Sequence, residues 1–185
     1  NKNYNLVFPS ELDINWQKNT TKSLLDKPRL LYVGRIKVEK GIFSLFNIFD
    51  EISIDAELSI VGNTKNLELK NKKINFFGFK NTVSTLMKVY DDHNITILPS
   101  FTEAHPKVVD ESLARARPVI IFEEINHIIQ NKHGIFVSKR DAKSLSETIE
   151  FIMSNYSNIQ EKMKKNKLPT KQVFISQITQ VLSQI

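Results

Sequence analysis

The 185-residue sequence contains no cysteine, and this absence excludes several kinds of protein at once. Disulfide scaffolds, thiolate catalysis, iron–sulfur clusters and cysteine zinc sites all need residues that the chain does not have. Glycine is also scarce, and no Gly-x-Gly-x-x-Gly, Walker loop or Gly-x-Ser-x-Gly elbow occurs. Dinucleotide-dependent hydride transfer, P-loop phosphoryl transfer and the common serine hydrolase arrangement therefore have no support in the sequence.

Long apolar runs are absent as well. Runs such as residues 118–122 fall far short of the roughly 20 residues that span a bilayer. The hydrophobic share of 41% and the charged share of 25% are typical of a folded globular domain, and we expect a cytoplasmic location. Since the chain starts with Asn1 and not with Met, we expect it to be part of a longer protein.

The charge is unbalanced, with 26 basic and 20 acidic residues and a net charge of +6. This excess indicates an anionic partner, which can be nucleic acid, a membrane surface or a phosphorylated small molecule. Only five of the basic residues are arginine, so we expect no nucleic-acid partner. The lysines between residues 162 and 171 are expected to form a solvated helix face, and peripheral contact with anionic lipid at the inner face of a membrane stays open as the alternative.

Short apolar runs alternate with amphipathic stretches, which is typical of βα units on a parallel sheet. Six runs predict buried strands, at residues 30–33, 58–61, 74–77, 95–98, 118–122 and 134–137. Apolar residues at helical spacing predict helices, at residues 41–52, 82–90, 106–116, 141–156 and 173–185. We therefore predict an α/β, Rossmann-like open parallel sheet of about six strands with helices on both faces, in a domain at 28–185 that follows a lead-in segment at 1–27.

The residues after the first predicted strand place cations at the start of a helix, where the helix dipole disfavours them unless an anion is bound. This is the edge at which open α/β sheets bind ligands. A diphosphate held by backbone N–H groups, Arg35 and Lys40 would resolve the conflict. A solvated turn in which Glu39 neutralises its neighbours explains the same residues, so both interpretations stay open.

Glu103 and Glu111 follow the fourth predicted strand in a Glu-x7-Glu pattern. On a helical wheel Glu111 points away from the core positions Val109 and Leu113. An i to i+4 pair with Arg115 is the simpler role for Glu111. The functional alternative is that Glu111 accepts hydrogen bonds from vicinal hydroxyl groups and Glu103 accepts those of a sugar.

Five motifs occur in a fixed order along the chain. They are Gly34-Arg35-x4-Lys40-Gly41, Val61-Gly62, Phe76-Phe77-Gly78-Phe79, Glu103-x7-Glu111 and Pro118-Val119-Ile120. In this order and spacing the chain resembles the nucleotide-sugar-binding C-terminal domain of retaining glycosyltransferases of family four, glycosyl transferases group one, which have the GT-B fold. Residues 6–13 resemble the segment that enters this domain from the interdomain linker.

The resemblance implies a function as the donor-binding half of a hexosyltransferase. Such an enzyme moves a sugar from a nucleotide-diphosphate sugar to a hydroxyl of a polysaccharide, lipid-linked or glycan acceptor, as in cell-surface polysaccharide biosynthesis. By this resemblance Arg35 and Lys40 hold the diphosphate and stabilise the leaving nucleotide, so no metal and no cofactor is expected. Glu103 orients the transferred sugar, and these three residues are the implied catalytic groups.

The resemblance also implies the rest of the donor site. Glu111 holds the ribose hydroxyls, Phe79 borders the base, and His105 acts through its backbone. The implied nucleotide-sugar-binding residues are Gly34, Arg35, Lys40, Gly62, Phe79, Glu103, His105, Pro106, Lys107, Val108 and Glu111. The acceptor site belongs to an N-terminal domain of the same protein, without which this half is expected to be inactive.

Several residues depart from the family pattern. Ala116 stands where Gly normally ends the helix, and a left-handed Ala there would cost about 1 kcal/mol. The loop after Ile120 lacks the usual Gly-Gly turn and Pro-Glu pair, and His127, where Glu is usual, is expected to be a loop histidine. Two alternatives therefore remain: a degenerate, non-catalytic GT-B lobe that binds nucleotide or a protein partner, and a GT-B sugar epimerase.

Overall fold

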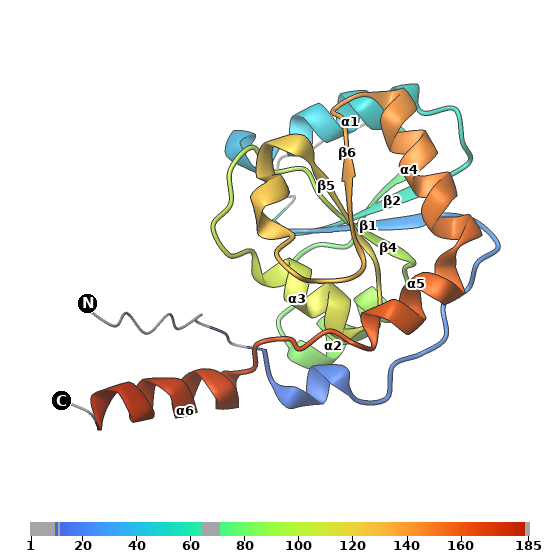
Figure 1. The fold of residues 1–185 in the computed structure, drawn as a ribbon. Coiled ribbons are helices and arrows are strands. Elements are labelled where there is room, and N and C mark those ends of the chain that lie inside the picture. Colours follow the sequence, from blue (N-terminus) through green and yellow to red (C-terminus); the bar gives the residue numbers. More distant parts are fainter. Residues whose placement is uncertain (1–9, 11, 64–70, 184–185) are drawn as a thin grey trace.

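The fold is a six-stranded sheet in which every neighbouring pair of strands is parallel (Figure 1). It comes from a computed structural model that describes residues 10, 12–63 and 71–183. The strands are β1 (Arg29–Val33), β2 (Glu57–Val61), β3 (Ile74–Phe76), β4 (Ile95–Leu98), β5 (Val119–Phe122) and β6 (Ile135–Ser138). Each predicted strand is confirmed to within one residue at either end, and the expectation for residues 6–13 lies mostly outside the described residues.

The central strands are buried along their whole length because they are covered on both faces. All four residues of β4 and all four of β5 are buried. Continuous apolar runs of this kind are typical of parallel strands between two helical layers. Helices α1 (Ile42–Glu51) and α4 (Ala142–Ser154) cover one face of the sheet, and α2 (Val83–Asp91) and α3 (Lys107–Ala114) cover the other (Figure 1). The predicted α/β fold with helices on both faces is confirmed.

The C-terminal part differs from the predicted helix at residues 141–156. Asp141 caps α4 as expected, by accepting a hydrogen bond from the Ser144 N–H at 2.8 Å. The helix ends at Ser154, however, and a second helix, α5 (Tyr156–Met163), follows it. The sequence analysis did not predict α5, because its buried residues, Tyr156, Ile159 and Met163, are separated by polar ones. The last helix, α6 (Lys171–Leu182), extends away from the sheet in Figure 1.

The lead-in segment packs onto the domain through a short 3₁₀ helix, η1 (Ile14–Gln17). The Trp16 side chain is buried and lies edge-on against the Tyr90 ring, with 5.7 Å between the ring centroids. Two fully buried arginines, Arg115 and Arg117, donate hydrogen bonds to backbone carbonyls of this segment. Guanidinium groups are costly to bury without such partners, so these bonds fix the segment firmly to the domain.

The strand order β3-β2-β1-β4-β5-β6 reverses direction between β1 and β4. At such a switch point the connections leave the sheet in opposite directions and open a crevice beyond the carboxyl ends of the strands. The loop after β1 carries Arg35 and the 3₁₀ helix η2 (Val38–Lys40), and the loop after β4 carries Glu103. The fold therefore brings the two sequence-predicted groups to one crevice.

Candidate functional site

A short ion pair joins the two loops across the crevice. The Lys40 Nζ donates to Glu103 Oε1 at 2.6 Å, and both side chains are largely buried. The same carboxylate oxygen accepts a hydrogen bond from the Ser100 hydroxyl at 2.7 Å. The Phe101 N–H donates to the Glu39 carbonyl at 3.1 Å, which ties the backbones of the two loops together. The cation predicted after the first strand and the carboxylate predicted after the fourth are thus in contact.

Two glycines allow the backbones at this edge to approach closely. A Cβ at Gly41 would lie 1.8 Å from the Pro99 carbonyl oxygen, and Gly41 has a left-handed φ of 66°. A Cβ at Gly62 would lie 2.2 Å from the Gly34 carbonyl oxygen. No side chain fits at such distances, so both positions need glycine. The close approach holds the start of α1 against the end of β4, beside Lys40.

A buried tyrosine on β1 holds the turn at Gly34 and Arg35 in place. The Tyr32 hydroxyl donates to the Arg35 carbonyl at 2.7 Å. Burial, together with the nearby Glu103 charge, raises the pKa of Tyr32 well above its usual range. The phenol therefore keeps its proton and remains a donor, and the Arg35 backbone is fixed in place.

The start of α3 supplies backbone amides to the same crevice. Pro106 is the N-cap residue, and its side chain has no oxygen with which to cap the first amides. Lys107 and Val108 begin the helix and line a cavity of about 510 Å³. Arg35, Lys40, Glu103, His105 and Pro106 line this central cavity too. Cations, a carboxylate and a helix N-terminus together fit a ligand that combines phosphate with hydroxyl groups.

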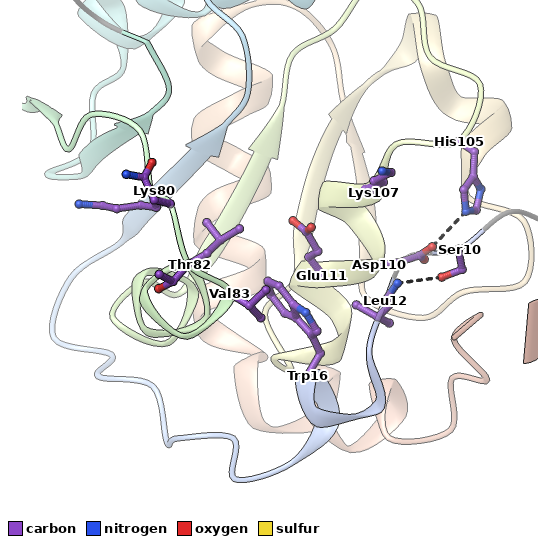
Figure 2. A pocket seen from close by; sticks show the side chains of 12 residues that line it. Ser10, Leu12, Trp16, Lys80, Thr82, Val83, His105, Lys107, Asp110 and Glu111 are labelled. Atoms are coloured by element: carbon purple, nitrogen blue, oxygen red, sulfur yellow. Dashed lines mark hydrogen bonds and ion pairs between the residues drawn. The ribbon is translucent and has the colours of Figure 1, made fainter. Parts of the chain in front are cut away.

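Two further cavities adjoin the central cavity, and they share Lys80 and Leu86 with each other. One, of about 510 Å³, shares Gly34 and Arg35 with it and adds Gly62 and Phe79 to its lining. The Phe79 side chain is 75% exposed, so its ring is available for a ligand to pack against. The other, of about 240 Å³, shares His105 and Lys107 with the central cavity and contains Glu111 (Figure 2). All eleven predicted donor-site residues therefore line one continuous crevice.

Glu111 contacts a buried tyrosine on the neighbouring helix. The fully buried Tyr90 of α2 donates its hydroxyl to Glu111 Oε2 at 2.9 Å. Arg115, the expected i to i+4 partner of Glu111, instead pairs with Asp91 through contacts of 2.5 and 2.9 Å. Burial and the Glu111 charge raise the pKa of Tyr90, so the phenol stays protonated.

The two histidines near the crevice differ in the groups that their side chains contact. The His105 Nε2 lies 3.3 Å from Asp110 Oδ2 (Figure 2). The Lys132 Nζ donates to the other oxygen of that carboxylate at 2.7 Å. The His127 ring, on the 3₁₀ helix η3 (Glu123–Ile128), bonds through Nε2 to the Glu103 carbonyl at 2.8 Å. His127 thus supports the loop that carries Glu103.

The described residues were also searched for other kinds of site. Within residues 10, 12–63 and 71–183, no three His, Asp or Glu side chains gather closely enough to hold a metal ion. None of the helices in that part of the chain has the length and apolar character needed to cross a membrane.

Residues 14–168 match the family model for glycosyl transferases group 1. The chain belongs to this family. Curated relatives include the uncharacterized glycosyltransferase MJ1607 of Methanocaldococcus jannaschii, 28% identical over 83% of this chain and 44% of its own length. Another is the capsular polysaccharide biosynthesis glycosyltransferase CapM of Staphylococcus aureus, 27% identical over 74% of this chain and 39% of its own length. The chain thus spans less than half of these relatives.

Solved structures of glycosyltransferases share the fold of this family member. The structure of HepE of Anabaena, solved in complex with UDP and glucose, matches this chain with a TM-score of 0.73. The match covers 97% of this chain and 56% of the HepE chain. At 13% sequence identity this likeness concerns the fold alone. It confirms that the sheet and its helices form one lobe of the GT-B architecture.

No sequence motif marks several residues of the crevice. In the sequence Tyr32 and Tyr90 look like core positions, because only the tip of a tyrosine is polar and its ring suits the interior. Ser100 stands next to a predicted strand without any distinguishing spacing. The only available signal for these residues was their place at the carboxyl end of a strand or on the helix that faces it.

Proposed function

We propose that this chain is the donor-binding half of a retaining glycosyltransferase that transfers a hexose from a nucleotide-diphosphate sugar. The observation that carries the proposal is the Lys40–Glu103 pair at the switch point, in a crevice that continues into two adjoining cavities, one with Glu111 and one with Phe79. A diphosphate, a sugar, a ribose and a base each need different binding groups, and the lining of the crevice contains groups suited to all four.

The diphosphate binds in the central cavity. Arg35, Lys40 and the first amides of α3 surround this space. Both phosphates can accept charge-assisted hydrogen bonds there, each contributing about 1.5–3 kcal/mol. The same groups stabilise the negative charge that develops on the leaving nucleotide, so the proposed reaction needs no metal.

The ribose lies next to Glu111 and the base lies near Gly62 and Phe79. A carboxylate accepts two hydrogen bonds and so suits the vicinal hydroxyls of ribose. That HepE is solved with UDP and with glucose supports a nucleotide sugar as the ligand class. Glu103 lies beside Lys40, where its carboxylate can accept hydrogen bonds from the hydroxyl groups of the transferred sugar. These bonds would orient the anomeric carbon of that sugar.

The acceptor binds to the N-terminal domain of the longer protein, and catalysis requires that domain. The relatives are more than twice as long as the parts that this chain matches. The name of CapM supports a role in polysaccharide biosynthesis. Cytoplasmic location and peripheral contact with a membrane stay predictions.

Thermal unfolding with nucleotides tests donor binding. We expect one of UDP, GDP and ADP to stabilise the chain by about 2.7 kcal/mol at a hundredfold excess over Kd. Lys40→Ala removes one charge-assisted contact and leaves Glu103 beside the phosphates, so Kd rises about tenfold to a hundredfold. Lys143→Ala, at an exposed lysine on α4, removes the same charge elsewhere and leaves Kd unchanged.

Two results count against the proposal. One is that none of the three nucleotides, nor their sugars, moves the melting point. The other is that Lys40→Ala and Lys143→Ala bind nucleotide alike, which would remove Lys40 from the site.

A non-catalytic lobe is the second candidate, and the η3 segment favours it. In place of the family's usual loop, His127 is seated on the Glu103 backbone. Release of nucleotide from the donor sugar by the longer protein separates the two candidates, because a binding lobe releases none.

A further inference from the structure

We propose that Tyr90 is a positioning residue for ribose recognition: its phenol holds the Glu111 carboxylate in the orientation that accepts the hydroxyl groups of a ribonucleoside diphosphate. The inference rests on the proposed function, because it assigns a role within the same donor site. It concerns a residue that touches no ligand itself and acts only through Glu111.

The geometry gives Glu111 a fixed hydrogen bond on one side and a cavity on the other. The Tyr90 hydroxyl lies 2.9 Å from Glu111 Oε2, and Tyr90 is fully buried. Figure 2 shows the Glu111 side chain among the residues that line the 240 Å³ cavity. A glutamate side chain has three rotatable bonds, and the hydrogen bond from Tyr90 restricts them. A carboxylate held by a buried donor loses less freedom when it binds a ligand, which raises affinity without a new ligand contact.

The position of the phenol is itself set from the lead-in segment. The Trp16 ring meets the Tyr90 ring at an angle of 73°. The Trp16 carbonyl accepts a hydrogen bond from Arg115 Nη1 at 2.9 Å, and Arg115 is anchored on Asp91. Arg115, the residue that follows α3, therefore fixes Trp16 against Tyr90, and Tyr90 orients Glu111 on α3.

The chemistry of Tyr90 suits this role over a wide pH range. Burial and the neighbouring Glu111 charge both raise the pKa of the phenol, which therefore keeps its proton and can only donate to the carboxylate. A donor that never ionises leaves Glu111 as an acceptor for the two hydroxyl protons of a ribose.

Binding of ribose and dideoxyribose nucleotides tests the inference. Calorimetric Kd values are measured for UDP, GDP and ADP and for their 2′,3′-dideoxy counterparts. We expect the unmodified chain to prefer the ribose form by about tenfold or more, which corresponds to one charged hydrogen bond. In Tyr90→Phe the Kd for the ribose form rises about threefold to tenfold, whereas the Kd for the dideoxy form stays the same. The preference therefore shrinks.

The matched control is Tyr156→Phe. Tyr156 is equally buried, and its hydroxyl donates to the Asn94 carbonyl at 2.6 Å, away from the crevice. This variant loses a buried hydrogen bond but keeps the full ribose preference. Glu111→Ala abolishes the preference, and adding Tyr90→Phe to it changes nothing further, because Tyr90 acts only through Glu111. Should Tyr90→Phe fail to fold, Glu111→Asp withdraws the carboxylate from the phenol and is expected to lose the preference too.

The outcomes separate this inference from the proposed function. A chain that binds none of the nucleotides overturns both. A chain that binds them without preferring ribose overturns the role of Glu111 and, with it, that of Tyr90. If Glu111→Ala loses the preference but Tyr90→Phe or Glu111→Asp retains it, or if Tyr90→Phe weakens both nucleotide forms equally, the inference about Tyr90 alone is wrong.

Discussion

Replacing Gly41 by alanine probes the contact that aligns the two halves of the crevice. A Cβ at this position would lie 1.8 Å from the Pro99 carbonyl oxygen, which belongs to backbone and cannot rotate away. Either the start of α1 or the end of β4 has to move. Lys40 precedes Gly41 directly, so any such movement also changes the distance between Lys40 and Glu103.

The structure gives a magnitude for the effect. Alanine at a φ of 66° costs about 1 kcal/mol relative to glycine. Overpacking against a fixed neighbour adds about 1–3 kcal/mol. The sum of about 2–4 kcal/mol lowers the melting temperature of a chain of this size by about 5–15 °C.

Gly78→Ala is the matched control for this measurement. Gly78 has nearly the same φ, 64°, but a Cβ there meets nothing within 4 Å. We expect Gly78→Ala to cost only the conformational term of about 1 kcal/mol. Chemical denaturation of both variants then isolates the contact. If Gly41→Ala destabilises the chain no more than Gly78→Ala does, the close approach of α1 and β4 is not as described.

Three other substitutions give sharp expectations. Ala116→Gly relieves a left-handed φ of 54° and should raise the free energy of unfolding by about 1 kcal/mol in urea. Burial lowers the pKa of His93, so the unfolded chain takes up the proton first and stability falls as the pH drops through about 6.5, the ordinary pKa of histidine. His93→Gln should lessen this loss, measured as melting temperature against pH. Arg140→Lys breaks a stack on Phe101 and a 2.6 Å pair with Glu124, and should lower the unfolding free energy by about 1–2 kcal/mol.

The strands and the location of the crevice could be predicted because they depend on patterns that are visible in the amino-acid sequence. A buried parallel strand is a short apolar run, and the order of such runs implies a switch point. The Lys40 and Glu103 groups follow two of these runs. Their meeting at 2.6 Å required only that the first and fourth strands be neighbours.

The partners of Glu111 could not be predicted, because they depend on contacts between residues far apart in the sequence. The i to i+4 rule pairs Glu111 with Arg115, but a surface pair contributes only a few tenths of a kcal/mol. A buried guanidinium needs several acceptors, and Arg115 finds them in Asp91 and in the lead-in carbonyls. Helix α5 was missed because polar residues in it outnumber its buried side chains, which are Tyr156, Ile159 and Met163.

The crystal structure of the chain with UDP, GDP or ADP, whichever binds tightest, tests the central claim most directly. The account predicts the two phosphates within hydrogen-bonding distance of Arg35, Lys40 and the first amides of α3, and the ribose hydroxyls on Glu111. A nucleotide bound elsewhere, for example in the 690 Å³ trough that Arg29 and Lys88 line away from these loops, would contradict it.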